Sequence, residues 1–386
     1  MQIEAMITGW SSKQKELHQA YADFGKSIIA PGYSGRYDQA QFAQEAWRQL
    51  ARETDFWRLP IPSTLGGMDG SWWDFTAALE GLASTAEDIG FLLSCIAQAG
   101  VLRGLLSQGN HPQQERYIPW ILEGALTATA IAEPQSGTDV PNVKTVAAQT
   151  PEGYHLNGDK WHIAHGSSAK LTLVVGRSAE TEGLTCFWVE NDTPGVEATP
   201  HKGLGGIRTL PIASLSFTDV PITEVALFGE AGKGLPALGS AVSLARPYYG
   251  LLAAQLLENA LPQVMEFLRT RQSFAQPILK HQQVQQKLTD VQLAISQARW
   301  TAYGALHTLL EGDPQAIMLG SVAKLAGTQG LITGSQTLLS LLSSHGYTQQ
   351  HPIFRLVQDA MGMMSVGGTE ETHRINIFNQ MQRLAR

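Results

Sequence analysis

Cysteine is nearly absent from this chain of 386 residues, which contains only Cys95 and Cys186. Two thiols are too few for a disulfide framework or a zinc cluster, so the sequence predicts no metal centre. Charged residues are also few, at 16% of the chain, and the formal net charge is −7. Proteins that bind nucleic acid gain affinity from a basic face, so this acidic balance argues against nucleic acid as a partner.

Long apolar runs are missing as well, because no stretch approaches the roughly 18 residues needed to span a bilayer. The first ten residues, MQIEAMITGW, lack the charged and apolar segments of a signal peptide. Hydrophobic residues nevertheless make up 43% of the chain, which is ordinary for a globular protein. We therefore expect a cytoplasmic enzyme without a membrane span.

Three regions of the sequence differ in pattern. Residues 1–124 are expected to form a helical domain, because apolar residues recur at three- and four-residue spacing in WWDFTAALEGLASTAEDIGFLLSCIAQAGVLRGLL. Residues 125–230 are expected to form a small, mostly antiparallel β-domain, because they contain strand-like runs such as AKLTLVVGR, LTCFWVEN and ASLSFTDV. Within YHLNGDKWHI, the pair Asn157-Gly158 predicts a tight hairpin turn, because both central positions of such a turn need positive φ.

In residues 231–386 the helical pattern returns. The spacing of apolar residues predicts a long helix that packs in a bundle through one apolar stripe. This stripe contains Val284, Leu288, Val291, Ile295 and Ala298. The order is therefore helices, then strands, then a helical bundle.

Three stretches at this spacing resemble the acyl-CoA dehydrogenase family of flavoproteins. They are AIAEPQSGTDV with the following LNGDKWHIAHG, then RTRQSFAQPILKHQQVQQKLTDVQ, and then QDAMGMMSVGGTEETHR. The resemblance runs over essentially the whole chain. It implies a mixed α and β, mostly α fold, with an N-terminal helical domain, a central β-domain and a C-terminal four-helix bundle.

The resemblance also implies FAD, bound between the β-domain and the bundle and partly contacted by a neighbouring subunit of a homodimer or homotetramer. In the loop IAEPQSGTD, Pro134 and Gly137 fix a turn whose backbone amides can point toward the ring edge. By resemblance, the residues of this loop that line the flavin or the substrate are Ile131, Ala132, Gly137 and Thr138. The family's pyrophosphate clamp is matched by Arg271, Ser273, Phe274 and Gln282. Arginine suits this role because its planar fork pairs with two phosphate oxygens.

In KWHIAHG the family places an aromatic residue, an apolar residue and a threonine against the flavin. Here these positions are His162, Ile163 and Ala164, so the threonine hydroxyl that normally meets the ring is missing. The threonine usually found where Ala132 stands is missing too. His162 is either a residue that stacks on the flavin and brings a titratable group to the chemistry, or a strand histidine with only a structural role.

The catalytic base of the family has no counterpart here. A typical member removes the α-proton of an acyl thioester with a glutamate that immediately precedes the Gly-Thr of the C-terminal motif, and this position is Gly367. Other members carry the glutamate on the first helix of the bundle, and this position is Ala245. A general base is worth roughly 10²–10⁴ in rate, so its absence argues against routine α,β-desaturation. The base is therefore unknown, and the amide of Gly367 remains available to hold a thioester carbonyl.

Two nearby features complete the predicted site. Thr369 and Glu371 match positions that contact or shape the flavin region, whereas Glu370 and Glu371 also stand where a helix begins and favours carboxylates. We favour these structural and cofactor roles for the glutamates over that of a replacement base. In the family an arginine at Arg246 lies behind the glutamate, and without that partner its buried charge is costly. Arg246 therefore either binds an anionic or strongly polar substrate group or pairs with another carboxylate.

The function that follows is an FAD-dependent oxidoreductase of acyl-CoA dehydrogenase type. We expect it to act on a small or polar acyl thioester, carried by CoA or by an acyl carrier protein, in a biosynthetic pathway, because relatives without the usual base occur there. The alternatives are a flavin-dependent monooxygenase on the same fold and a flavin-binding protein with little turnover. The sequence leaves the acyl group and the electron acceptor open.

Overall fold

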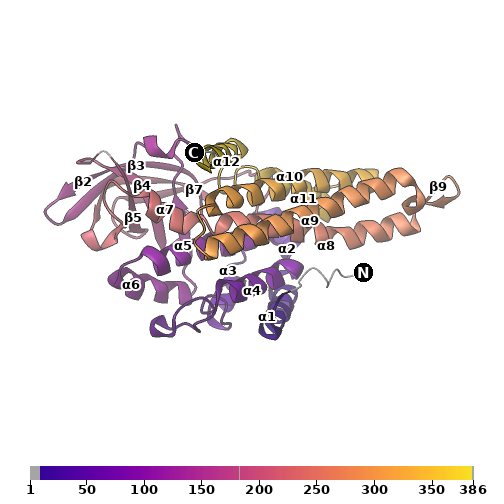
Figure 1. Ribbon diagram of the computed structural model, residues 1–386, viewed down its shortest axis with the longest axis horizontal. Helices are drawn as coiled ribbons and strands as arrows, with labels where there is room; N and C mark the ends of the chain where they lie inside the picture. The colour runs from indigo at the N-terminus through magenta and orange to yellow at the C-terminus, as the bar shows by residue number, and fades with distance from the viewer. Residues whose placement is uncertain (1–8, 182, 385–386) are drawn as a thin grey trace.

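A computed structural model describes residues 9–181 and 183–384, with a β-sheet at one end of an elongated molecule and long helices running to the other end (Figure 1). The helices of the amino-terminal region are α1 (Ser12–Phe24), α2 (Tyr33–Gln39), α3 (Gln44–Arg52), α4 (Trp72–Thr85), α5 (Ile89–Gln108) and α6 (His111–Leu122). Capping boxes begin three of them, at Ser11, Ser71 and Asn110, where the side chain accepts from a backbone amide one turn on. The helical prediction for this region is confirmed.

Helix α5 is the apolar centre of that region. This helix of 20 residues contains an 18-residue window with a mean hydropathy of 1.7, which is long and apolar enough to cross a membrane, yet 83% of that window is buried within the fold. The prediction that no apolar run approaches this length was wrong. Polar residues such as Ser94 and Gln98 interrupt the run in the sequence, but they are themselves buried in the helix. Their hydrogen bonds with Gly90, Thr127 and His165 make α5 a core helix.

The sheet is mixed but mostly antiparallel, as predicted. Its strands are β1 (Thr127–Ala130), β2 (Val146–Thr150), β3 (Gly153–Ala164), β4 (Leu171–Ser178), β5 (Leu184–Glu190), β6 (Val196–Pro200), β7 (Ile212–Ile222) and β8 (Leu227–Phe228). Their order is β6-β7-β3-β2-β4-β5-β8, and β1 pairs with β4. The two parallel pairings are β1 with β4 and β2 with β4.

The predicted hairpin turn at Asn157-Gly158 is wrong. Strand β3 continues through this pair with a shift in its register against β7, and the turn between β2 and β3 instead joins Thr150 to Gly153. Gly158 has φ +142°, and an added Cβ would lie 2.7 Å from the Cα of Thr145. The glycine is therefore required by a close approach of backbone within the sheet, where Asn157 accepts a hydrogen bond from the amide of Asp219.

The carboxyl-terminal region is helical, as predicted. It contains α7 (Leu235–Val242), α8 (Ala245–Thr270), α9 (Gln282–Leu310), α10 (Ala316–Leu342), α11 (Pro352–Gly362) and α12 (Glu370–Leu384), with a short hairpin of β9 (Gln272–Ser273) and β10 (Gln276–Pro277) between α8 and α9. Helices α8, α9 and α10 pack together, and α11 and α12 lie against α10. Along the predicted stripe of α9, Val291, Ile295 and Ala298 are buried.

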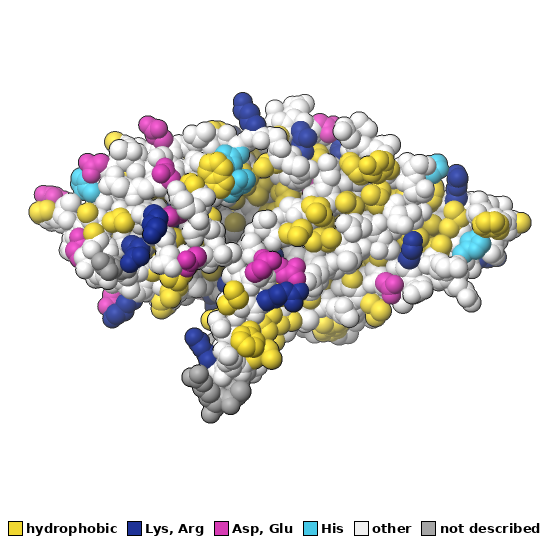
Figure 2. Space-filling model, turned by 90° about the horizontal axis from the view of Figure 1, so that it is seen from above, with side chains coloured by type: hydrophobic (Ala, Val, Ile, Leu, Met, Phe, Trp, Pro, Cys, Tyr) yellow, Lys and Arg dark blue, Asp and Glu magenta, His cyan; other side chains and the backbone are white. Residues whose placement is uncertain are grey.

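Helices α8 and α10 cross at close range near the candidate site. An added Cβ at Gly327 would lie 2.6 Å from the Cα of Gly250, so the two helices approach closely at these glycines. One turn earlier on α8, the side chain of Arg246 lies against Gly320 of α10. Seen from above, the molecule is hollowed where the sheet meets the helices, and histidine and hydrophobic side chains gather beside this hollow (Figure 2).

Candidate functional site

The loop after β1 is held in shape by a buried ion pair. Lys160 of β3 lies 2.8 Å from Glu133, and both side chains are almost completely buried. The Lys160 ammonium also donates to the carbonyl of Ile131, and Glu133 accepts from the amides of Lys144 and Thr145. Burial raises the pKa of Glu133, but these donors lower it by more, so the carboxylate stays ionised. The pair thus fixes the backbone on which Ile131 and Ala132 stand.

The open side of this loop carries two of the predicted residues. Gly137 and Thr138 are exposed, and nothing lies within 4 Å of the Cβ position of Gly137. Ile163 is different, because its side chain is only 3% exposed and packs in the core, which leaves its backbone as the part able to face a ligand. Ala164 is half-buried at the end of β3.

His162 stands at a β-bulge in β3. The register with β7 shifts between Lys160 and Ile163, and His162 has φ +54°. A bulge re-aims side chains and is frequent next to functional sites. The exposed imidazole lies in contact with the rings of Trp161 and His201, at centroid distances of 5.3 and 4.6 Å. Burial and the neighbouring His201 lower the pKa of His162, so it is neutral at neutral pH.

The C-terminal motif forms a turn whose backbone carbonyls accept hydrogen bonds from side chains of α10 and α12. Lys324 of α10 donates to the carbonyls of Met364 and Gly368, at 3.1 and 3.0 Å. His373 lies 3.1 Å from the carbonyl of Gly367 through Nε2, and Nδ1 lies 3.1 Å from the hydroxyl of Ser321. Because a carbonyl only accepts, the Nε2 atom of His373 carries the proton. Burial, Arg246 and Lys324 lower the pKa of His373 to about 4, which keeps it neutral.

The amide of Gly367 is left available by this arrangement. Within the described part of the chain, its N–H has no hydrogen-bond acceptor. Helix α12 begins at Glu370, which confirms that Glu370 and Glu371 stand at a helix start. Glu370 pairs with Arg374 and accepts from Gln329, and the pKa of Glu371 is lowered by its own amide and by Thr369.

A hollow of about 180 Å³ opens beside this turn. It is lined by Lys324, Thr328, Gln329, Ile332, Met364, Ser365, Thr369, Glu370 and Glu371. The structure thus brings the predicted pair Thr369 and Glu371 together at one cavity. Burial lowers the pKa of Lys324 to about 8, and Glu370 opposes this shift.

Arg246 follows Ala245, one of the two positions where the family carries its catalytic glutamate. Ala245 is buried at the first turn of α8, and Arg246, which follows it, is half-buried. Burial lowers the pKa of the Arg246 guanidinium, and the group that opposes this shift is the hydroxyl of Tyr249 rather than an acid. Among residues 9–181 and 183–384, Arg246 makes no ion pair.

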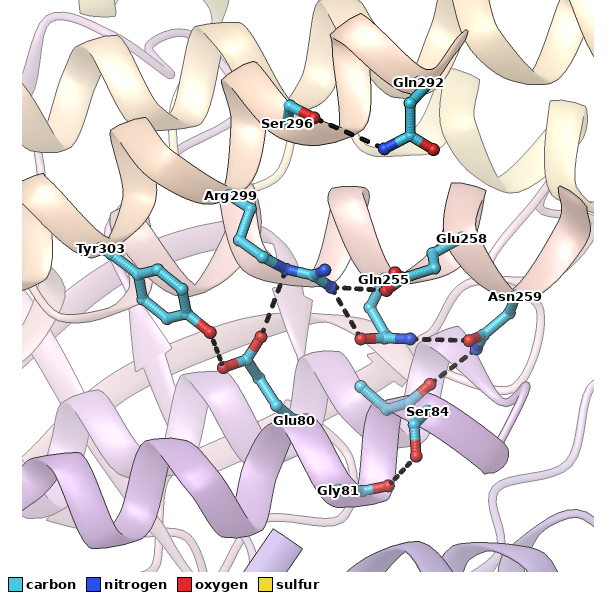
Figure 3. Close-up of polar contacts among 11 residues, drawn as sticks. Glu80, Gly81, Ser84, Gln255, Glu258, Asn259, Gln292, Ser296, Arg299 and Tyr303 are labelled. Atoms are coloured by element: carbon cyan, nitrogen blue, oxygen red, sulfur yellow. Dashed lines mark hydrogen bonds and ion pairs between the residues drawn. The ribbon is translucent and has the colours of Figure 1, made fainter. Parts of the chain in front are cut away.

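Arg299 of α9 shows what a paired buried arginine looks like in this bundle (Figure 3). Its Nη2 lies 2.8 Å from Glu258 and 2.8 Å from the side-chain oxygen of Gln255, and its Nε lies 3.7 Å from Glu80. Tyr303 donates to the other oxygen of Glu80.

The predicted pyrophosphate clamp lies at the opposite end of α8. The 25 steps from Arg246 to Arg271 correspond to about 37 Å at 1.5 Å per residue. Arg271 contacts His345 at 3.2 Å, and Gln282 begins α9 beside it. Ser273 belongs to β9, and Phe274 at the tip of the hairpin is 92% exposed with φ +52°. The structure therefore does not bring these residues to the β-domain of the same chain, and they project outward at the end of the molecule (Figure 1).

Sequence reasoning missed the residues that support the two loops. Glu133 lies inside the quoted motif, but its partner Lys160 is 27 residues away. Lys324, His373 and His201 were also missed. An isolated buried lysine in an apolar helix, as in SVAKLAG, was the one local signal available for Lys324.

Comparisons with known proteins agree with this architecture. Models of the acyl-CoA dehydrogenase N-terminal, middle and C-terminal domains match residues 11–125, 128–220 and 232–382. The mitochondrial 2-methylacyl-CoA dehydrogenase of Solanum tuberosum is 26% identical, with 95% of this chain and 90% of the relative covered. The crystal structure of the prolyl acyl carrier protein oxidase AnaB is 25% identical with a TM-score of 0.92, covering 96% of this chain and 99% of that one. Butyryl-CoA dehydrogenase from Megasphaera elsdenii is 25% identical with a TM-score of 0.90, covering 97% and 99%.

The fold and these matches define a flavoprotein oxidoreductase. The chain belongs to the acyl-CoA dehydrogenase family, whose three domains span nearly its whole length, and it is an FAD-dependent enzyme.

Proposed function

We propose that this enzyme oxidises a small acyl thioester with an anionic or strongly polar group, on CoA or an acyl carrier protein, in a biosynthetic pathway. The observation that carries the proposal is the unpaired guanidinium of Arg246 beside a turn in which Gly367 replaces the usual carboxylate. A half-buried charge without a partner loses part of its hydration, and a substrate that supplies the opposite charge offsets that cost. The likeness to a prolyl acyl carrier protein oxidase supports the carrier-protein form.

The residues present fit FAD. The exposed loop around Gly137, the imidazole of His162 at its bulge and the cavity beside Thr369 and Glu371 are open surfaces with polar edges. When bound, FAD supplies the acceptor for the two electrons removed from the substrate. On this chain, Ile163 contacts the flavin or the substrate through its backbone. We assign the other contacts with the flavin or the substrate to Ile131, Ala132, Gly137, Thr138, His162, Ala164, Thr369 and Glu371.

The pyrophosphate clamp supports a site shared between subunits. Arg271 and Arg246 lie at opposite ends of α8, so one FAD cannot reach both the turn of Gly367 and the hairpin of the same chain. Phe274 and Ala275 have φ of +52° and +61°, a strained turn for residues other than glycine. An exposed aromatic ring at a strained tip fits a role on a neighbouring subunit. We propose a homodimer or homotetramer in which the clamp of Arg271, Ser273, Phe274 and Gln282 serves the partner's FAD.

The substrate is held by a backbone N–H group and by a charged side chain. The unoccupied N–H of Gly367 is suited to donate to the thioester carbonyl, and Arg246 holds the anionic or polar group of the acyl chain. His162 stays neutral on the flavin side. With no carboxylate at position 367 or 245, this arrangement favours oxidation of a carbon that bears a hydroxyl, whose chemistry does not require loss of an α-proton.

An anaerobic panel of acyl thioesters tests the proposal. CoA and carrier-protein forms of short hydroxylated, carboxylated and unsubstituted acyl groups are mixed with the holoenzyme, and the visible absorbance of the flavin is followed. We expect bleaching by a hydroxylated or carboxylated thioester. Indifference to every thioester, together with oxygen-dependent hydroxylation when reduced FAD is supplied, would instead identify a monooxygenase. Indifference in both assays would leave a flavin-binding protein with little turnover.

A further inference from the structure

We infer that Tyr249 and Gly367 are a matched pair that sets the size of the acyl group, with the tyrosine ring filling the space that a side chain at position 367 would take. This inference rests on the proposed function, because it concerns the same substrate site. It assigns to Tyr249 the role of a specificity-determining residue.

The contact between the two residues is direct. A Cβ added to Gly367 would lie 2.3 Å from Cε2, 3.0 Å from Cδ2 and 3.2 Å from Cζ of Tyr249. Distances below about 3 Å are far inside van der Waals contact, which for carbon atoms begins near 3.5 Å. The three atoms belong to the ring itself, so rotation of a flexible chain end cannot relieve the clash. Gly367 also has φ +69°, which favours glycine independently.

The ring of Tyr249 is fixed in this position. Its side chain is buried on α8, where Gly250 makes the close crossing with Gly327 of α10 described above. Burial raises the pKa of Tyr249 to about 12, with Arg246 opposing the shift, so the phenol is neutral at neutral pH. Tyr249 therefore has no capacity to replace the missing base, but its hydroxyl can donate a hydrogen bond.

The side of α8 that faces the amino-terminal helices is closely packed. The adjacent Tyr248 lies 3.0 Å from the hydroxyl of Thr76 on α4, which ties α8 to the amino-terminal helices. The cavity between α4, α5 and α8 at this point measures only about 10 Å³. This is about the space for a single water probe. Tyr249 is thus held on a closely packed helix, and an acyl chain that extends past the turn of Gly367 would meet its ring.

The pairing has a consequence for the missing base. The ring excludes a glutamate at position 367, and the glycine allows the ring, so each residue accounts for the other. Restoring the carboxylate alone cannot restore the usual site. Only removal of the ring together with introduction of the carboxylate opens the space that an α-proton acceptor needs.

The first test is a stability cycle on the holoenzyme. Gly367→Ala is introduced into the wild type and into Tyr249→Val, and the thermal midpoint of each variant is measured. The backbone strain of alanine at φ +69° is common to both backgrounds and cancels. We expect the alanine to lower the midpoint more in the wild type, by at least about 2 °C. Equal effects in the two backgrounds would overturn the matched pair.

A neighbouring glycine provides the control. An added Cβ at Gly368, which has φ +105°, would meet Nε2 of His373 at 3.2 Å and not Tyr249. Gly368→Ala is therefore expected to have the same effect with and without Tyr249→Val. Tyr249→Phe keeps the ring, so Gly367→Ala is expected to act in that background as it does in the wild type. Non-additivity at Gly368 of the same size would contradict a specific contact.

The second test measures size selection, which a merely structural role would not change. Dissociation constants of saturated acyl-CoA thioesters of increasing chain length are obtained from the perturbation of the flavin spectrum under argon. Each methylene accommodated in an apolar pocket is worth roughly 10-fold or more. We expect Tyr249→Val to bind longer chains at least 10-fold more tightly than the wild type, and Tyr249→Phe to retain the wild-type profile. An unchanged profile in Tyr249→Val would refute the role in specificity.

The third test adds the carboxylate. We expect butyryl-CoA to bleach the flavin in Tyr249→Val/Gly367→Glu at least 10-fold faster than in either single variant. Equal rates in Gly367→Glu alone would contradict the inference. Failure of the proposed function is distinguishable, because it appears as a wild-type flavin indifferent to every thioester while the stability cycle still shows coupling. Loss of coupling with an active wild type rejects the pair alone.

Discussion

Arg299 and Arg246 are both arginines enclosed by the long helices of the bundle, and they differ in what faces them. Arg299 meets two carboxylates, and burial of its charge is compensated within the fold (Figure 3). Burial lowers the pKa of Arg246, and its hydrogen-bonding groups have no acidic partner among the described residues. Arg299 is buried and Arg246 is half-buried, and this difference alone does not separate a structural arginine from a functional one. The partner does, and for Arg246 the partner that completes the charge pair is the proposed substrate.

The largest effect is expected for Arg299→Met. Glu80 and Glu258 would be left without their cation, and breaking a buried pair by removing one partner costs roughly 3–5 kcal/mol of the free energy of unfolding. Chemical denaturation of the holoenzyme measures this loss. The rate of flavin reduction per folded molecule should stay at the wild-type value. A variant as stable as the wild type would show that the network of Figure 3 is not structural.

Arg246→Met should give the opposite pattern. No carboxylate is orphaned, so the thermal midpoint is expected to stay equal or to rise. The second-order rate constant for flavin reduction should fall by roughly 30- to 1,000-fold, or about 2–4 kcal/mol of lost transition-state binding. Arg246→Lys serves as the conservative control and should retain part of the activity. Survival of both turnover and substrate affinity in Arg246→Met would remove the proposed role.

A third arginine extends the comparison to the exposed tip. Arg271→Gln should weaken FAD binding by about 10- to 100-fold, because hydrogen bonds to charged groups are worth roughly 1.5–3 kcal/mol. Titration of the apoenzyme with FAD measures the effect. Arg269, on the same helix end, pairs with Glu266 at 2.5 Å and is the matched control. If Arg269→Gln weakened binding as much as Arg271→Gln, the clamp assignment would be incorrect.

The smallest effect concerns pH. The pKa of His373 is lowered to about 4 by burial, by Arg246 and by Lys324. A lowered folded-state pKa gives stability that is present above the unfolded value of about 6.5 and is lost as the pH falls toward 4. Removing the charge of Arg246 raises the pKa of His373, so Arg246→Met should lose about 1 kcal/mol less than the wild type between pH 7 and 4.5. Denaturation at several pH values measures the slope, and Arg299→Met should keep the wild-type slope. An unchanged slope in Arg246→Met would show that the two groups are not coupled.

Local sequence patterns were sufficient for the order of helices and strands. The apolar spacing of α4, α5 and α9 and the strand-like runs of the sheet predicted their types, and the resemblance predicted the fold and FAD. The start of α12 at Glu370 followed from two carboxylates after a Gly-Thr turn. The absence of a base at Gly367 and Ala245 was also visible in the sequence alone.

Contacts between distant segments could not be predicted. Asn157-Gly158 has the composition of a hairpin turn, but Thr145 in another segment determines its conformation by close approach. The space at Gly367 is taken by Tyr249, more than a hundred residues earlier, and no periodicity signals such a contact. The same holds for Lys160 and Glu133, because a buried ion pair depends on where the two chains meet.

The most direct measurement is the anaerobic binding of two thioesters of equal carbon number, succinyl and butyryl, followed by the perturbation of the flavin spectrum in the wild type and in Arg246→Met. We expect the wild type to bind the carboxylated thioester at least 10-fold more tightly, a difference of about 1.4 kcal/mol. We expect this preference to disappear in Arg246→Met. A wild type that prefers butyryl, or a preference that survives in Arg246→Met, would contradict the proposed role of Arg246.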